Sequence, residues 1–86
     1  MQRGWVVSSD YRSASDAIKA VRTELGVSQR ELARRLGKPS SFINKIELLE
    51  RRLDIVEFIA IANALEMKAA DLLKAVLGAV PDHVQI

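Results

Sequence analysis

Two short helical patterns on either side of a glycine constrain the fold of this chain more than any other part of its sequence. Residues 28–48 read SQRELARRLGKPSSFINKIEL. Apolar residues recur at helical spacing on both sides of Gly37, at Leu32, Ala33 and Leu36 before it and at Phe42, Ile43, Ile46 and Leu49 after it. Neither helix is long enough to be stable alone, so each needs tertiary packing. We therefore expect two helices joined by a tight turn, in which Gly37 has a positive φ.

Capping signals define the ends of this helix pair. Ser28 is a good N-cap, and Glu31 three residues later completes the capping-box pattern. Pro39 has no backbone N–H and suits the first position of the second helix. Ala33 is expected where the two helices cross, because a larger side chain there would push them apart.

A further helix is predicted before this pair, from about residue 14 to residue 25. Its N-cap is expected at Ser13 or Ser15, and Gly26 fits the left-handed position that follows a helix end. One face of this helix is apolar and consists of Ala14, Ala17, Ile18, Val21 and Leu25.

Two more helices follow the pair, and both are unusually apolar. The first begins near Asp54, a possible N-cap, and is apolar on most sides, so we expect it to be the central buried element. The second spans about residues 70–77 and has apolar residues on more than one face. A surface helix needs only one apolar face, so the second face predicts a homodimer contact through this helix and the apolar C-terminal residues. Packing of both faces on the N-terminal Trp5-Val6-Val7 segment is the alternative.

These patterns together predict an all-α fold of five helices in a single domain. Residues 1–12 are expected to form an N-terminal arm, residues 13–77 the folded domain, and residues 78–86 a C-terminal tail. A chain of 86 residues buries a modest core, and a partner subunit is a common source of additional stability.

The composition argues against several classes of function. With no cysteine and one histidine, His83, the chain offers no disulfide and no expected metal or cofactor site. No serine has a histidine base in a recognisable motif, and Glu47 and Glu50 lie among arginines, which favours ion pairing over acid–base catalysis. No apolar run approaches the roughly 20 residues of a membrane span, and the N-terminal apolar stretch is too short for a secretory signal. We expect a cytoplasmic protein that is not an enzyme.

Positive charge is concentrated in the middle of the chain. The net charge is +2, but residues 28–52 alone contain seven basic and three acidic residues. Residues 53–86 contain two basic and five acidic residues. A local positive excess is typical of a surface that binds a polyanion, and a solvated helix face accounts for the charge equally well.

Several motifs in the same register resemble one known family. They are Arg22, Gly26-Val27-Ser28-Gln29, Glu31-Leu32-Ala33, Leu36-Gly37, Ile46-Glu47, Glu50-Arg51-Arg52-Leu53-Asp54, Glu57-Phe58 and Ala64-Leu65. Through them the stretch from Ala17 to Leu73, about two thirds of the chain, resembles the lambda-repressor/Cro family of helix-turn-helix proteins, also called the XRE type. The resemblance implies a bacterial or phage protein with five helices, in which helices 2 and 3 form the helix-turn-helix. Its partner would be double-stranded DNA, bound by the third helix in the major groove, usually as a symmetric dimer.

The resemblance also implies roles for individual residues on the third helix. Ser40, Ser41 and Lys45 match positions that reach base edges, and Asn44 matches a position near the bases or the DNA backbone. A lysine can donate to guanine O6 or N7, whereas a serine donates or accepts and discriminates weakly alone.

Five further positions match residues that contact the DNA backbone. Lys38, Arg51 and Arg52 are expected at phosphates, where they would set the register without reading the sequence. Arg30 is expected there as well, and Gln29 matches a glutamine that contacts a phosphate or supports the first base-reading residue.

Arg22 and Glu47 match a buried or half-buried ion pair of the family, so a structural role is expected for both. The chain departs from the family at Leu49 and Glu66, where glycine is usual. Leu49 would either adopt the left-handed conformation, at a cost of roughly 1 kcal/mol, or let the helix continue by a turn. Leu48, apolar on the outward face, is expected to touch a thymine methyl group or a protein partner.

Two functions follow from these observations. The first is a sequence-specific transcriptional regulator, expected to be a repressor that binds a pseudo-palindromic operator as a homodimer. The alternative is a protein-interaction module, such as an antitoxin or an adaptor, which keeps the helix-turn-helix fold but binds DNA weakly. Leu48, Leu49 and the apolar residues 76–80 motivate this alternative.

Overall fold

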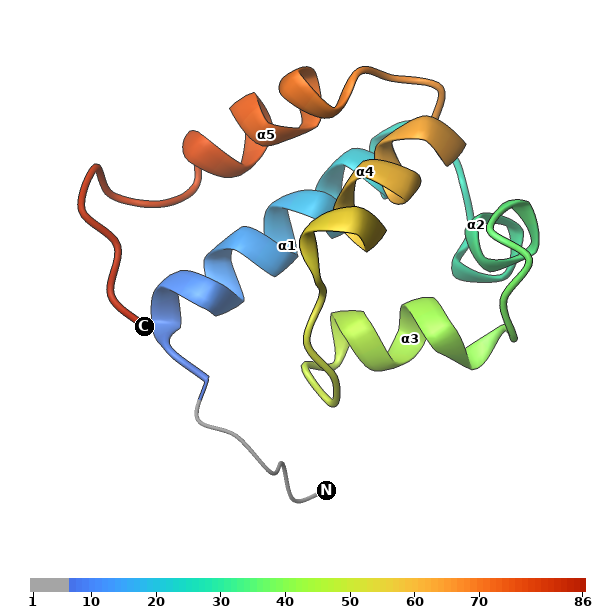
Figure 1. Cartoon of the computed structure of the whole chain (residues 1–86), viewed down its shortest axis with the longest axis horizontal. Coiled ribbons are helices and arrows are strands. Elements are labelled where there is room, and N and C mark those ends of the chain that lie inside the picture. The colour runs from blue at the N-terminus through green and yellow to red at the C-terminus, as the bar shows by residue number, and fades with distance from the viewer. Residues whose placement is uncertain (1–6) are drawn as a thin grey trace.

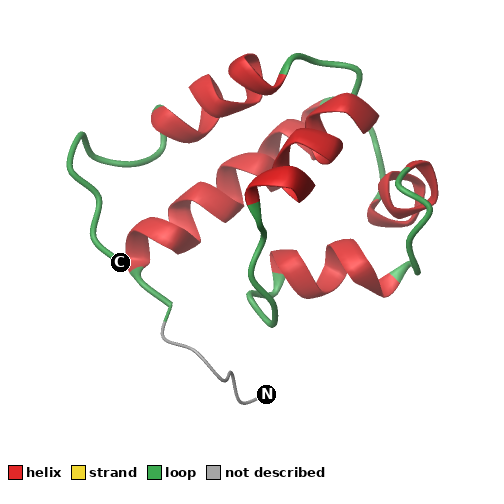
Figure 2. Cartoon of the chain, in the orientation of Figure 1, coloured by secondary structure: helices red, strands yellow, loops and turns green. Residues whose placement is uncertain are grey.

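The computed structural model describes residues 7–86, which form five α-helices and the loops between them (Figure 1). The bounds of the helices are α1 Ser9–Glu24, α2 Gln29–Arg35, α3 Ser41–Glu47, α4 Ile55–Ala64 and α5 Ala69–Leu77. No strand occurs in the described part of the chain (Figure 2). The predicted all-α fold of five helices is confirmed. The Trp5-Val6 part of the expected N-terminal arm lies outside the described residues.

The core lies where all five helices meet. Helix α5 runs beside α1, and α2 packs against α3 (Figure 1). The largest side chains that are fully buried come from four different helices, and they are Leu32, Ile43, Ile61 and Leu72. Ala33 is also fully buried, as a small residue expected at a helix crossing would be. Each short helix is therefore stabilised by contacts with its neighbours.

Four of the five helices end with the same backbone motif. The residue after each C-cap has a positive φ, and these residues are Gly26, Gly37, Leu49 and Glu66. In each case its N–H donates to the carbonyl three residues back, and the next N–H donates to the carbonyl five residues back. This is the Schellman arrangement, which satisfies carbonyl groups left without a partner at a helix end. The positive φ values expected for both glycines are confirmed.

The two non-glycine residues in this motif differ in burial. Leu49 adopts the left-handed conformation with φ 62°, so α3 does not continue by another turn. Its side chain is only 3% exposed, and burial of a leucine, worth about 2 kcal/mol, offsets a backbone cost of about 1–2 kcal/mol. Glu66 also has a positive φ, 59°, but its side chain is exposed, so no burial offsets the cost of the left-handed backbone.

The glycine and glutamate positions predict opposite mutational effects. Gly26→Ala is expected to destabilise the protein by about 1 kcal/mol, although no atom would lie within 4 Å of the new Cβ, because φ is +71°. Gly78→Ala is the control, because its φ is negative and the new Cβ makes ordinary contacts. Glu66→Gly is expected to stabilise by about 0.5 kcal/mol through relief of backbone strain. Urea unfolding measures all three, and an equal effect of the two alanine substitutions would contradict the backbone explanation.

Helix α1 begins earlier than the sequence predicted. Ser8 is the N-cap, and its hydroxyl accepts from the Tyr11 backbone N–H at 3.0 Å. The expected N-caps Ser13 and Ser15 lie inside the helix, and residues 9–12, assigned to the arm, form its first turn. The sequence pattern did not reveal this start, because the first turn is polar and its long-range hydrogen bonds come from distant backbone N–H groups: Leu53 donates to the Tyr11 hydroxyl and Gln85 to the Asp10 carboxylate.

Three further expectations about the helices need correction. Helix α4 is not the central buried element, because its first turn is open to solvent and Ile55 is 79% exposed. The N-cap at Asp54 is confirmed, and the structure adds a reciprocal bond from the Asp54 backbone N–H to Glu57, which completes a capping box. Leu25 is exposed because it lies beyond the last residue of α1. Helix α3 begins at Ser41, two residues after Pro39, whose carbonyl accepts from Phe42.

Candidate nucleic-acid interface

Helices α2 and α3 are held at a fixed angle by the turn between them. The Ser28 hydroxyl caps α2 by accepting from the Glu31 backbone N–H at 3.0 Å. After the helix, Gly37 and Lys38 donate to the carbonyls of Arg34 and Ala33. The inner sides of both helices enter the core, so the outer side of α3 remains available to a partner.

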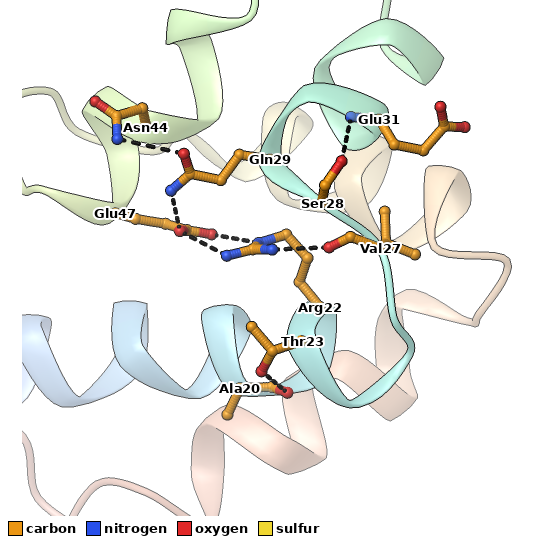
Figure 3. A network of polar contacts seen from close by, with 9 residues as sticks. All are labelled: Ala20, Arg22, Thr23, Val27, Ser28, Gln29, Glu31, Asn44 and Glu47. Atoms are coloured by element: carbon orange, nitrogen blue, oxygen red, sulfur yellow. Dashed lines mark hydrogen bonds and ion pairs between the residues drawn. The ribbon is translucent and has the colours of Figure 1, made fainter.

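A network of polar side chains lies behind α3 (Figure 3). The Arg22 guanidinium donates from Nε and Nη2 to the Glu47 carboxylate at 2.7 and 3.0 Å. Its Nη1 donates to the Val27 carbonyl at 2.7 Å. The two side chains are 8% and 7% exposed, so the pair is buried, and each of the three guanidinium nitrogens donates to a protein acceptor. The structural role expected for Arg22 and Glu47 agrees with this geometry.

The same network extends to the surface through two amide side chains. Gln29 Nε2 donates to Glu47 Oε1 at 2.7 Å, and Asn44 Nδ2 donates to Gln29 Oε1 at 3.3 Å. Both ends of the Gln29 amide are therefore used inside the protein, and its side chain supports Asn44. This arrangement is compatible with the supporting role expected for Gln29, and its Nε2 carries a second N–H that a phosphate contact would use.

The predicted base-reading residues lie together on one side of α3. Ser40, Ser41 and Lys45 are exposed, and Asn44 is half-buried beside them. Leu48 follows on the same face and is 54% exposed. The face thus combines small hydroxyl groups, one amide, one cation and one apolar side chain, which are the groups that distinguish base edges in a major groove.

Of the five residues predicted at the DNA backbone, Gln29 is half-buried in the network behind α3, three cations are exposed, and Arg51 is paired. Arg30, Lys38 and Arg52 are exposed around the ends of α2 and the loop after α3. Arg51 instead forms a two-point ion pair with Glu57, at 2.9 and 3.1 Å. The sequence analysis missed Glu57 as its partner.

Two other arginines of the positively charged stretch 28–52 are paired with one carboxylate. Glu31 accepts from Arg34 and from Arg35 at 2.6–2.8 Å, instead of completing the predicted capping box. Hydrogen bonds from Arg34 and then Arg35 lower the pKa of Glu31 to about 2. Arg35 also donates to the Ala64 carbonyl at the end of α4. The i+3 and i+4 spacings were readable in the sequence as a signal for these pairs.

An apolar groove lies on another part of the surface, between α1, α4 and α5. Its volume is about 490 Å³, and its lining includes Ile55, Phe58 and Ile59 from α4 and Leu73 and Val76 from α5. The second apolar face predicted for α5 is therefore present, because Leu72 is buried while Leu73 is exposed. Packing of this face on Trp5 and Val6 lies outside the described residues.

Other kinds of site are not found in residues 7–86. Within them no group of three histidine or acidic residues could hold a metal ion. No helix in the same range is long and apolar enough to cross a membrane.

Comparison with known proteins identifies the class of this fold. Residues 18–72 match the helix-turn-helix family HTH_3. An XRE-family-like protein from Pseudomonas syringae pv. tomato str. DC3000 is 36% identical, with a TM-score of 0.74 over 85% of this chain and 89% of the other. The chain belongs to the XRE-type helix-turn-helix family, whose members are DNA-binding transcriptional regulators and not enzymes. No curated protein matches the chain.

Two other solved structures are similar to the chain. The wild-type restriction-modification controller protein C.Esp1396I is 26% identical, with a TM-score of 0.79 over 91% of this chain and 100% of the other. The clp gene regulator ClgR from C. glutamicum has the same fold at 20% identity, with a TM-score of 0.72 over 86% of this chain and 95% of the other.

Proposed function

We propose that the protein is a repressor that binds a pseudo-palindromic operator as a homodimer. The observation that carries this proposal is the outer face of α3, which is exposed and polar but held from behind by the buried network around Glu47. A reading surface must be rigid as well as exposed, because base contacts form only within hydrogen-bonding distance. In this proposal Ser40, Ser41, Asn44 and Lys45 read bases.

Backbone contacts are proposed for the exposed cations around this face. Arg30, Lys38 and Arg52 would neutralise phosphates and fix the orientation of the domain on the duplex. The guanidinium of Arg51 pairs with Glu57 within the protein.

The apolar groove supports the proposed homodimer. A second copy covering Ile59, Leu73 and their neighbours would remove a contiguous apolar surface from water. Two α3 helices related by a twofold axis would then enter successive major grooves about 34 Å apart.

The first experiment is selection of binding sites from a random-sequence duplex pool, followed by fluorescence anisotropy of the enriched site at several salt concentrations. The proposal predicts an inverted repeat bound at least about a thousandfold more tightly than random DNA, with affinity that falls steeply as salt rises. Weak binding of equal strength to all sequences would refute an operator function for the isolated protein.

Lys45→Ala is expected to lower affinity for the selected operator by about 5- to 150-fold and to relax the preference at one base pair, because one base contact is lost. Lys74→Ala is the matched control, since it removes the same charge from an exposed position on α5. Anisotropy on the operator and on its single-base variants measures both effects. An equal loss for the two variants would show that Lys45 contributes only charge.

The alternative function is a protein-interaction module with weak DNA binding. The exposed Leu48 beside the polar face of α3 is the observation that favours it. In that case Leu48→Asp would disrupt a complex with a protein partner, while Lys45→Ala would have little effect on it. Under the operator proposal, by contrast, Lys45→Ala weakens binding to the selected operator.

A further inference from the structure

The loop between α3 and α4 contains an arginine that is held from two sides. Arg51 donates from Nη1 and Nη2 to the Glu57 carboxylate at 3.1 and 2.9 Å. The carbon at the centre of its guanidinium lies 4.8 Å from the centroid of the Phe42 ring, within the range of a cation–π contact. We call Phe42, Arg51 and Glu57 the Arg51 cluster.

The carboxylate in this cluster is itself fixed. Glu57 Oε1 also accepts from the Asp54 backbone N–H at 3.0 Å, and Asp54 Oδ1 accepts from the Glu57 backbone N–H at 2.7 Å. Glu57 is therefore part of the N-cap of α4 and is not a free surface side chain. Hydrogen bonding to Arg51 lowers the pKa of Glu57, and the same bond raises the pKa of Arg51, so both groups stay charged near neutral pH.

The Arg51 cluster connects α3 with α4, two helices whose backbones do not come close to each other. Helix α3 packs on α1 and α2, but no Cα atom of α3 lies within 8 Å of one in α4. Phe42 belongs to the first turn of α3, next to Ser41 and three residues before Lys45. The cluster thus fixes the exposed beginning of α3 relative to the start of α4.

The pairing with Glu57 also removes the usual reason for an arginine to bind DNA phosphate. Phosphate binding is driven largely by the release of counterions, which requires uncompensated positive charge. The negative charge of Glu57 lies within hydrogen-bonding distance of Arg51, so the pair has no net charge to contribute. Exchange of Glu57 for a phosphate would moreover break two hydrogen bonds that the protein already makes.

We propose that Arg51 is a positioning residue, which acts on DNA binding by holding Phe42 and the first turn of α3 against the N-cap of α4, and not by contacting a phosphate. This proposal rests on the proposed operator function. In this proposal Arg51 and Glu57 act together, so the loss of either side chain weakens DNA binding. If Arg51 contacted a phosphate, Glu57 would compete with that phosphate for the guanidinium.

The test compares Arg51→Gln, Arg51→Lys, Glu57→Gln and the double variant Arg51→Gln/Glu57→Gln on the selected operator. Arg30→Gln serves as the control for an exposed arginine proposed at a phosphate. Anisotropy is measured over a series of salt concentrations, at a temperature where urea unfolding shows each variant to be folded. Two quantities are compared, the affinity and the slope of log K against log salt.

The positioning role predicts that every Arg51 and Glu57 variant lowers operator affinity by about three- to tenfold and leaves the salt slope unchanged. The double variant should be no weaker than either single variant. Arg30→Gln should reduce the magnitude of the salt slope by about 0.9, the value for one phosphate contact. Arg51→Lys is informative even if Arg51→Gln folds poorly, because lysine keeps the charge but loses the two-point pairing.

Two results would overturn the proposal. In the first, Arg51→Gln reduces the salt slope by about one, while Arg51→Lys binds like the wild type and Glu57→Gln binds as well or better, which would make Arg51 a phosphate contact. In the second, none of the variants changes operator affinity, which would make the cluster irrelevant to DNA binding. A wild-type protein that selects no operator would instead refute the proposed function, and the positioning role with it.

Discussion

Arg22→Met is expected to destabilise the protein by about 3–5 kcal/mol, the range for removing one partner of a buried ion pair. The remaining Glu47 carboxylate would stay buried with only Gln29 as a donor, because its two bonds to Arg22 are lost. The Val27 carbonyl would lose its bond to Arg22 as well. Since a small domain has a total stability near the lower end of 5–15 kcal/mol, this one substitution is expected to unfold a large fraction of the molecules.

Urea unfolding followed by circular dichroism measures the change in the free energy of unfolding. Two further variants serve as controls. Arg34→Met removes an exposed arginine that also pairs with a glutamate, and it should change stability by no more than about 0.5 kcal/mol. Arg22→Met/Glu47→Leu removes both charges, and it should recover much of the loss because no unpaired charge remains buried. Equal costs for Arg22→Met and Arg34→Met would show that burial of the pair has no energetic consequence.

The features of this fold that were predictable from the sequence depend on local chemistry. The Ser28 cap, the glycines after α1 and α2, and the N-cap at Asp54 each involve residues within a few positions of one another. The spacing of apolar residues at three and four positions then identified which sides of α2 and α3 are buried. The proposed base-reading face follows from the same pattern, because it consists of the α3 positions that the apolar residues do not occupy.

The features that were not predictable depend on contacts between distant parts of the chain. The early start of α1 involves the bond between Tyr11 and Leu53, which are far apart in the sequence. The exposure of Ile55 depends on which neighbours cover α4, and composition alone does not contain that information. The pairing of Arg51 with Glu57 was not predictable from spacing, because the two residues are six positions apart and Arg51 lies in the loop before α4, so no i+3 or i+4 helical pattern relates them.

The homodimer proposal makes the second large prediction, for a substitution that leaves the folded monomer intact. Leu73 lines the apolar groove and is nearly half exposed, so Leu73→Glu removes little buried surface from the monomer. A charged side chain at the centre of a dimer contact would be buried without a partner, which strongly disfavours association. We expect Leu73→Glu to be monomeric. Its free energy of unfolding should equal that of the wild-type monomer, which is measured at protein concentrations low enough for the wild-type dimer to dissociate.

Loss of the dimer is expected to weaken operator binding by about a hundredfold or more, because the second half-site is no longer bound intramolecularly. Sedimentation velocity gives the oligomeric state, and anisotropy on operators with one or two half-sites gives the affinities. Lys74→Glu is the control, since it alters charge more but lies outside the groove lining, and it should remain a dimer. Leu73→Glu should bind one-half-site and two-half-site operators with similar affinity per half-site, whereas the wild type should strongly prefer two. If Leu73→Glu stays dimeric and keeps that preference, the dimer contact lies elsewhere on the molecule, and the groove between α1, α4 and α5 has another occupant.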